Sequence, residues 1–276
     1  MVSTEIALAG LGYAAPTAEA GILRLSDDAL QPESVVVAEE VPIAIVYNGR
    51  PHVVVMGTPV DLEDLAVGFS VTESIVDDAG GIARTEVVRA SHGIELQIEL
   101  FAQAADRLEA RARGLIARTG CGLCGVETIK DAMRMPDKLP HTLGISRESL
   151  WLAAKQLAER QTLNNRTSTI HAAAWANASG EIQLVREDVG RHNALDKVLG
   201  ALLRAGTSPS GGFVVITSRA SYEMVQKAAA CGVELVAAIS RPTALAIRFA
   251  TESGVTLVGL LRGRTANVYT GSERIT

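Results

Sequence analysis

The feature that most constrains the fold is a regular alternation of strand-like and helix-like segments after residue 180. The runs EIQLVRED, GGFVVITS, VELVAAIS and VTLVGLL are short, apolar and bounded by turn residues, as buried strands are. Between them, GRHNALDKVLGALLRAG, EMVQKAAACG and PTALAIRFATESG have the spacing of helices. Strands that alternate with helices through short connections form a parallel or mixed sheet covered by helices. We therefore predict an α/β domain over residues 139–276.

The N-terminal half has another pattern. The run VPIAIVYNGRPHVVVMG contains two β-rich segments around Asn48-Gly49, the preferred dipeptide for a type I′ hairpin turn. Further elements are expected as a helix from about Leu62 to Thr72, a second pair of strands turning near His92-Gly93, and a helix over residues 104–115. These predict a smaller α+β domain over residues 33–138. Residues 1–32 show no sustained period and are expected to be a partly ordered arm.

Composition argues against several classes of protein. Hydrophobic residues make up 47% of the chain but aromatic residues only 4%, a balance typical of aliphatic α/β packing. A formal net charge of -5 argues against a general nucleic-acid-binding surface, which needs clustered lysine and arginine. No apolar run approaches the roughly 18 residues of a membrane span, and the first residues lack the basic segment of a secretion signal. We expect a cytoplasmic protein with no nucleic-acid or membrane partner.

Two of the three cysteines, Cys121 and Cys124, lie in one glycine-rich segment, RTGCGLCGVE. A zinc site would need four ligands, and the five histidines are scattered singly. A redox dithiol usually opens a helix after a strand, whereas glycines on both sides of this pair predict an exposed loop. Both interpretations stay open, but the segment is better suited to a nucleophilic thiol that carries sulfur as a persulfide beside a second thiol. Cys231 lies in an alanine-rich segment and is expected to be buried packing.

Arginine recurs in the loops that follow the predicted strands, which read REDVGRH, TSRASYE, ISRPT and RGRTANVYT. In a parallel sheet such loops share one edge, where helix N-termini attract anions. Taken alone, EDVGRHNALDKVLG could be an ordinary capped surface helix, and His171 an ordinary core histidine. Their convergence on one edge predicts an anion-binding site there.

These motifs together resemble the FdhD family. The resemblance rests on RTGCGLCGVE, EDVGRHNALDKVLG, SRASYEMVQKAAACGVE and TLVGLLRGRTANVYT, and it runs from about Val35 to Arg274. It implies a cytidine-deaminase-like α/β domain in a homodimer. It also implies a sulfurtransferase that accepts persulfide sulfur from a cysteine desulfurase and passes it to the molybdenum cofactor, bis-molybdopterin guanine dinucleotide, to activate formate dehydrogenase. By motif position, Cys121 corresponds to the persulfide-carrying cysteine and Cys124 to its partner.

The resemblance places a cofactor-binding segment on residues 260–265. Together with the predicted edge, the candidate cofactor-binding residues are Leu260, Leu261, Arg262, Gly263, Arg264, Thr265, Ser218, Arg219, Ser221, Glu187, Asp188, His192 and His171. Helices that start near Ser221 and Thr243 are expected to point free N–H groups at this edge. GDP or GTP, as fragments of the cofactor, are expected to bind in preference to ADP or ATP, with a carboxylate of Glu187 or Asp188 facing the guanine N–H groups.

Two other functions stay open, and no resident metal is predicted. One is a non-catalytic chaperone of the molybdenum cofactor, in which the cysteines only tune redox state or docking. The other is a zinc-dependent dimer in which two CxxC segments pool four thiolates. Deaminase chemistry is not expected, because the signature H-x-E with P-C-x-x-C is absent: Ala173 stands two residues after His171, and no proline precedes Cys121.

Overall fold

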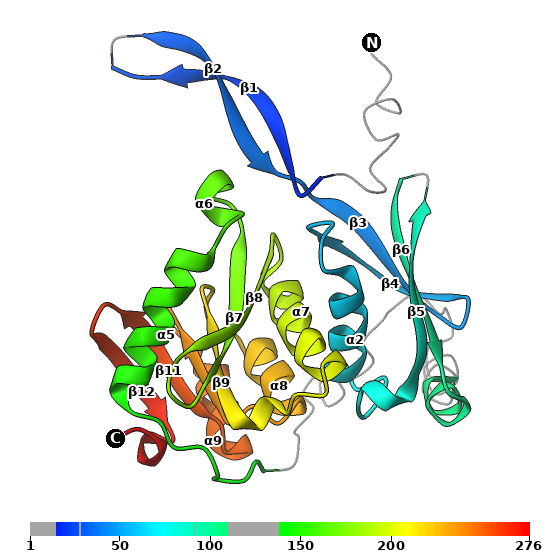
Figure 1. The fold of residues 1–276 in the computed structure, drawn as a ribbon, viewed down its shortest axis with the longest axis vertical. Helices are drawn as coiled ribbons and strands as arrows, with labels where there is room; N and C mark the ends of the chain where they lie inside the picture. Colours follow the sequence, from blue (N-terminus) through cyan, green and yellow to red (C-terminus); the bar gives the residue numbers. More distant parts are fainter. Residues whose placement is uncertain (1–14, 28, 91, 110–137) are drawn as a thin grey trace.

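The computed structural model describes residues 15–27, 29–90, 92–109 and 138–276, which form two units, each built on its own sheet (Figure 1). The N-terminal unit has a four-stranded sheet in the order β4-β3-β6-β5. Its elements are β3 (Val41–Tyr47), β4 (Arg50–Gly57), α2 (Leu62–Thr72), the short 3-10 helix η1 (Ala79–Gly81), β5 (Ile82–Ala90) and β6 (Gly93–Leu100). Helix α2 and both strand pairs confirm the prediction, and residues 102–109 are helical, as expected for the described part of the last helix.

The turn between β3 and β4 follows from its two residues. Asn48 and Gly49 both have a left-handed backbone, with φ of 49° and 76°, which a type I′ turn requires. The Asn48 side chain also accepts a hydrogen bond from the amide of Leu100 at 2.8 Å, and this bond ties the turn to β6.

The segment expected as an arm is more regular than predicted. Strands β1 (Thr17–Leu25) and β2 (Leu30–Ala38) form an antiparallel hairpin that stands away from both sheets (Figure 1). Near its tip, Leu23, Leu25 and Leu30 are exposed. Strand register places these leucines on one face, because Leu25 pairs with Leu30, while the ion pair between Arg24 and Glu33 lies on the other. Apolar and charged side chains therefore alternate along this hairpin as they do in strands, but sequence reasoning did not identify these strands.

The C-terminal unit is a six-stranded mixed sheet in the order β12-β11-β10-β9-β7-β8. Its strands are β7 (His171–Asn177), β8 (Ile182–Asp188), β9 (Gly212–Ile216), β10 (Leu235–Ala238), β11 (Thr256–Arg262) and β12 (Thr265–Thr270). Strands β9, β10 and β11 are parallel, β7 is antiparallel to both of its neighbours, and β12 is antiparallel to β11. The α/β class is confirmed. The finer, cytidine-deaminase-like arrangement stays a prediction.

Helices cover both faces of this sheet. The helices are α5 (Arg147–Arg160), α6 (Asn164–Thr167), α7 (Arg191–Arg204), α8 (Tyr222–Ala230) and α9 (Ala244–Ser253), with short 3-10 helices η2 (Pro209–Gly211) and η3 (Ser272–Arg274). Alternate strand residues point to opposite faces: Val214 packs in the core beneath α7, α8 and α9, whereas Val215 packs beneath α5. None of the helices in the described ranges is long and apolar enough to cross a membrane.

Two glycines bring the units together at α2 and α7. A Cβ placed on Gly68 would lie 1.8 Å from the backbone oxygen of Asp196, and one on Gly200 would lie 1.9 Å from the backbone oxygen of Asp64. The two helix backbones are therefore in direct contact. The Asp64 carboxylate adds ion pairs to Arg186 and Arg204 across the same junction.

Candidate functional site

The strand-end loops lie at one edge of the C-terminal sheet. Strands β8, β9, β10 and β11 all run in one direction. β8 and β9 are parallel because each is antiparallel to β7, β10 is parallel to β9, and β11 is parallel to β10. The loops of residues 189–190, 217–221 and 239–243 and the turn after β11 therefore meet this edge, as predicted. The reversed strand β7 begins there with His171, which pairs in register with Asp188.

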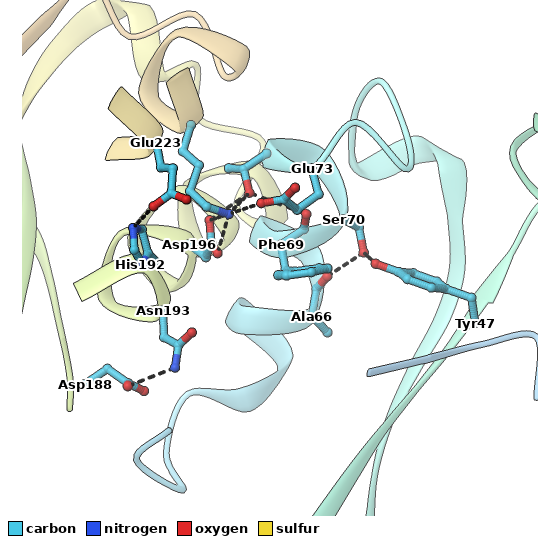
Figure 2. Close-up of polar contacts among 12 residues, drawn as sticks. Tyr47, Ala66, Phe69, Ser70, Glu73, Asp188, His192, Asn193, Asp196 and Glu223 are labelled. Carbon is cyan, nitrogen blue, oxygen red and sulfur yellow. Dashed lines mark hydrogen bonds and ion pairs between the residues drawn. The ribbon is translucent and has the colours of Figure 1, made fainter. Parts of the chain in front are cut away.

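Asp188 organises the start of α7. It is fully buried, and its carboxylate accepts hydrogen bonds from Lys197 Nζ at 2.6 Å, the Gly190 amide at 2.7 Å and the Thr58 amide at 3.1 Å. Asn193 Nδ2 donates to it at 3.0 Å (Figure 2). A buried carboxylate is stable only when it is paired and hydrogen-bonded in this way. Asp188 thus fixes the loop before α7 and joins it to the end of β4.

Glu187 has a similar internal role. Its carboxylate accepts hydrogen bonds from the amides of Leu163 at 2.9 Å and Asn164 at 2.8 Å, and from Thr162 Oγ1 at 3.1 Å. It therefore satisfies the free donors at the start of α6. The expected base-facing role for Glu187 or Asp188 finds no support here, because the protein's own donors already occupy both carboxylates.

The N-termini of α7 and α8 meet at the edge. His192 Nε2, in the first turn of α7, lies 2.7 Å from Glu223 Oε2, in the first turn of α8 (Figure 2). Burial lowers the pKa of His192; the Glu223 carboxylate opposes this shift, and the charges of Arg191 and Lys227 reinforce it. Neither helix has a hydrogen bond from a capping side chain, although Ser221 stands at the N-cap of α8. Helix donors are thus left available on two adjoining termini.

Polar atoms without partners lie at the same place. Arg191 Nε and Ser221 Oγ are both buried from solvent and have no hydrogen-bond partner among the residues that the structure describes. The pKa of His171 is lowered by burial and then by the positive charge of Arg191, so His171 lies near Arg191. Ser218 behaves differently, because its hydroxyl donates to the backbone oxygen of Arg219 at 3.1 Å.

Helix α9 does not offer the free N-terminus that was expected. Thr243 Oγ1 accepts a hydrogen bond from the amide of Ala246 at 3.2 Å, so the helix caps itself. The arginines of the neighbouring loops, Arg219, Arg241, Arg262 and Arg264, are exposed at the edge. Arg262 Nε also makes a long contact of 3.4 Å to the backbone oxygen of Ile239.

The segment 260–265 makes a tight turn between β11 and β12. Leu260 has an unusual positive φ of 52°, and its amide donates to the backbone oxygen of Ser240 at 3.0 Å. Thr265 Oγ1 donates to the Arg262 oxygen at 3.1 Å, and Gly263 between them has a φ of 57°. Leu261 is fully buried in the core beneath α5, so only its backbone could meet a ligand. Strained backbone of this kind is common at ligand sites.

Sequence reasoning missed a buried ionic network behind the edge. Lys227 Nζ lies 2.9 Å from Asp196 Oδ2, 2.7 Å from Glu73 Oε1 and 3.0 Å from Thr72 Oγ1 (Figure 2). The ammonium also lies 5.3 Å from the ring centroid of Phe69. Burial lowers the pKa of Lys227, but the Asp196 and Glu73 carboxylates outweigh that effect and raise it. The network joins α8 to the end of α2, and the pattern of a charged surface helix gave no sign of it.

The cysteines divide into two cases. Cys121 and Cys124 lie outside the described residues. Cys231, after α8, packs against the core beneath α7, α8 and α9 and against the core of the N-terminal unit, and burial raises the pKa of its thiol to about 12. A thiol in such surroundings is a poor nucleophile. In the parts of the chain that the structure describes, no group of three histidine, cysteine or acidic side chains could hold a metal ion.

Comparison with known proteins identifies related chains over nearly the whole length. A model of the FdhD/NarQ family matches residues 38–276. The chain is 45% identical over 279 residues to the sulfur carrier protein FdhD of Cupriavidus necator, covering 100% of this chain and 96% of that one. It is 50% identical over 239 residues to the sulfur carrier protein FdhD of Xanthomonas euvesicatoria pv. vesicatoria, covering 87% of this chain and 85% of that one.

The fold has a match among solved structures. It is similar, with a TM-score of 0.76 and 25% sequence identity, to the crystal structure of a "putative formate dehydrogenase accessory protein" from Desulfotalea psychrophila. The similarity covers 94% of this chain and 99% of that one.

Proposed function

The chain belongs to the FdhD/NarQ family, and on that premise we propose that it is a sulfur carrier in the maturation of formate dehydrogenase. The observation that carries the proposal is the identity of 45% and 50% to two sulfur carrier proteins, over spans that include most of both chains. The cysteine pair Cys121 and Cys124 falls inside the family match, residues 38–276.

In the proposed loading step, the Cys121 thiolate attacks the outer sulfur of a persulfide on a cysteine desulfurase. The sulfur–sulfur bond of the donor breaks, the donor cysteine leaves as a thiolate, and Cys121 becomes a persulfide. No oxidant is needed, since the sulfur moves between thiols at the same oxidation level. Cys231 does not compete, because burial keeps it in the thiol form.

In the proposed release step, Cys124 supplies the electrons. Its thiolate attacks the Cys121 sulfur of the persulfide, a Cys121–Cys124 disulfide forms, and the outer sulfur leaves as hydrosulfide with the bonding electron pair. The acceptor is the molybdenum cofactor, bis-molybdopterin guanine dinucleotide, held as substrate at the edge of the C-terminal sheet. The exposed arginines of this edge suit the phosphates of its nucleotides. A homodimer would offer two such edges to its two nucleotides.

The test is intact mass after incubation with a cysteine desulfurase and cysteine. The wild type should gain one sulfur atom, and Cys121→Ala should gain none at an unchanged melting temperature. Cys231→Ala is the matched control and should load as the wild type does. If Cys121→Ala still loads sulfur and activates formate dehydrogenase, the carrier assignment is wrong. If the wild type loads no sulfur but still binds the cofactor, the chain is a cofactor chaperone instead.

A further inference from the structure

We propose that the adjoining N-termini of α7 and α8, with Arg191 and Ser221, form a binding site for a phosphoryl group. The inference deepens the proposed function, because it assigns the phosphates of the cofactor's nucleotide to this cluster rather than to the exposed arginines alone. Arg191 was not among the residues predicted for the site.

The first argument is that two helix termini are held against each other. The pair His192 and Glu223 links the first turns of α7 and α8 at 2.7 Å. These helices have 14 and 9 residues, so each has a full set of aligned peptide dipoles. An anion beside both termini would accept backbone N–H donors and be favoured by two dipoles at once.

The second argument is that the usual capping groups are not used. Ser146 at the start of α5 and Thr243 at the start of α9 accept hydrogen bonds from their own helices. Ser221 is the same kind of residue at the same helix position, yet its Oγ is buried without a hydrogen-bond partner. A hydroxyl in that state loses hydration without compensation unless a ligand supplies a partner.

The third argument is the state of Arg191. Its Nε is buried without a hydrogen-bond partner, and no carboxylate in the described ranges forms an ion pair with its guanidinium. The other nearby basic groups are not available, since the lowered pKa of His192 leaves its ring mainly uncharged, and Lys227 pairs with Asp196 and Glu73. Arg191 is therefore the cation left for an incoming anion. Guanidinium groups suit phosphate because they donate two parallel hydrogen bonds.

The experiment is calorimetric titration of the full chain with inorganic diphosphate, GDP and guanosine. Diphosphate and GDP should bind, and guanosine should bind far more weakly. Arg191→Gln should weaken diphosphate and GDP alike by about tenfold or more, the effect of losing a hydrogen bond to a charged group. Equal diphosphate affinity in the wild type and Arg191→Gln, or no diphosphate binding by the wild type, would overturn the site.

Two serines provide a crossed control. Ser221→Ala should weaken diphosphate binding with little change in melting temperature, since its hydroxyl caps nothing. Ser146→Ala should lower the melting temperature and leave binding unchanged, because its hydroxyl caps α5. The reverse result would show that Ser221 is only structural. Sulfur loading in these variants is measured separately: diphosphate binding without sulfur loading in the wild type would sink the proposed function and leave this site standing.

Discussion

Removing the ammonium of Lys227 tests whether the buried network holds the two units together. In Lys227→Met, Asp196 keeps its hydrogen bond from Thr72 Oγ1 at 2.7 Å but loses its cation, while its side chain remains 1% exposed. A buried carboxylate without a cation either stays charged at high cost or takes up a proton. The smaller of these two free-energy costs sets the destabilisation expected for Lys227→Met.

The cost of protonation can be estimated from the unfolded state. An aspartate with a pKa of about 3.9 requires about 1.36 kcal/mol per pH unit to be protonated above that value, or about 4 kcal/mol at pH 7. This agrees with the usual cost of about 3–5 kcal/mol for breaking a buried ion pair. At pH 5 the same calculation gives a protonation cost of about 1.5 kcal/mol. Because the pKa of the folded variant is raised, its stability relative to the wild type should recover as pH falls towards 4.

The assay is urea unfolding of wild type and variant at pH 7 and pH 5. Lys155→Met is the control, because Lys155 pairs with Glu159 only at 4.0 Å on the surface, and it should cost less than about 1 kcal/mol at both pH values. The double variant Lys227→Met with Asp196→Asn should regain much of the loss, since no charge is then buried alone. A cost for Lys227→Met that is below about 1 kcal/mol, or that does not shrink at pH 5, would refute the reasoning.

Two further predictions concern single residues. Asn48→Ala should destabilise the protein by about 2 kcal/mol in urea unfolding, because alanine tolerates the positive φ poorly and the hydrogen bond from the Leu100 amide is lost. Asn48→Gly loses only the hydrogen bond and should cost about half as much. Equal costs for the two variants would show that the positive φ contributes nothing. Cys231 should resist iodoacetamide in the folded protein at pH 8 and react once urea is added, since its pKa is raised to about 12. Mass spectrometry of the peptide measures this, and equal modification rates with and without urea would show that the thiol is not protected.

Local signals predicted the fold where they were strong. The Asn48-Gly49 turn depends on two neighbouring residues, so the sequence is enough to identify it. Strand β7 was missed because alanine makes up most of its centre, and alanine has little intrinsic preference for strands. Its alanines are buried between helices on both faces of the sheet, a tertiary condition that no local pattern contains.

The meeting of the strand-end loops at one sheet edge was predicted, but the contacts of their residues were not. The position of this edge follows from the common direction of the parallel strands, which the alternation of strand-like and helix-like segments in the sequence predicts. The roles of its charged residues depend on partners far away in the chain: Asp188 meets Thr58, and Asp196 meets Lys227. A charged run therefore looked like a solvated helix face, although it holds three buried carboxylates, those of Glu187, Asp188 and Asp196. Only the structure could show that Arg191 has no such partner within the described part of the chain.

The contact between Gly68 and Gly200 has a consequence for how the protein can move. Domains usually shift by sliding layers of interdigitated side chains or by bending a hinge between them. Where two helix backbones touch, there is no side-chain layer to slide, and the ion pairs of the buried Asp64 and Asp196 carboxylates resist opening. The two sheets should therefore tumble as one body.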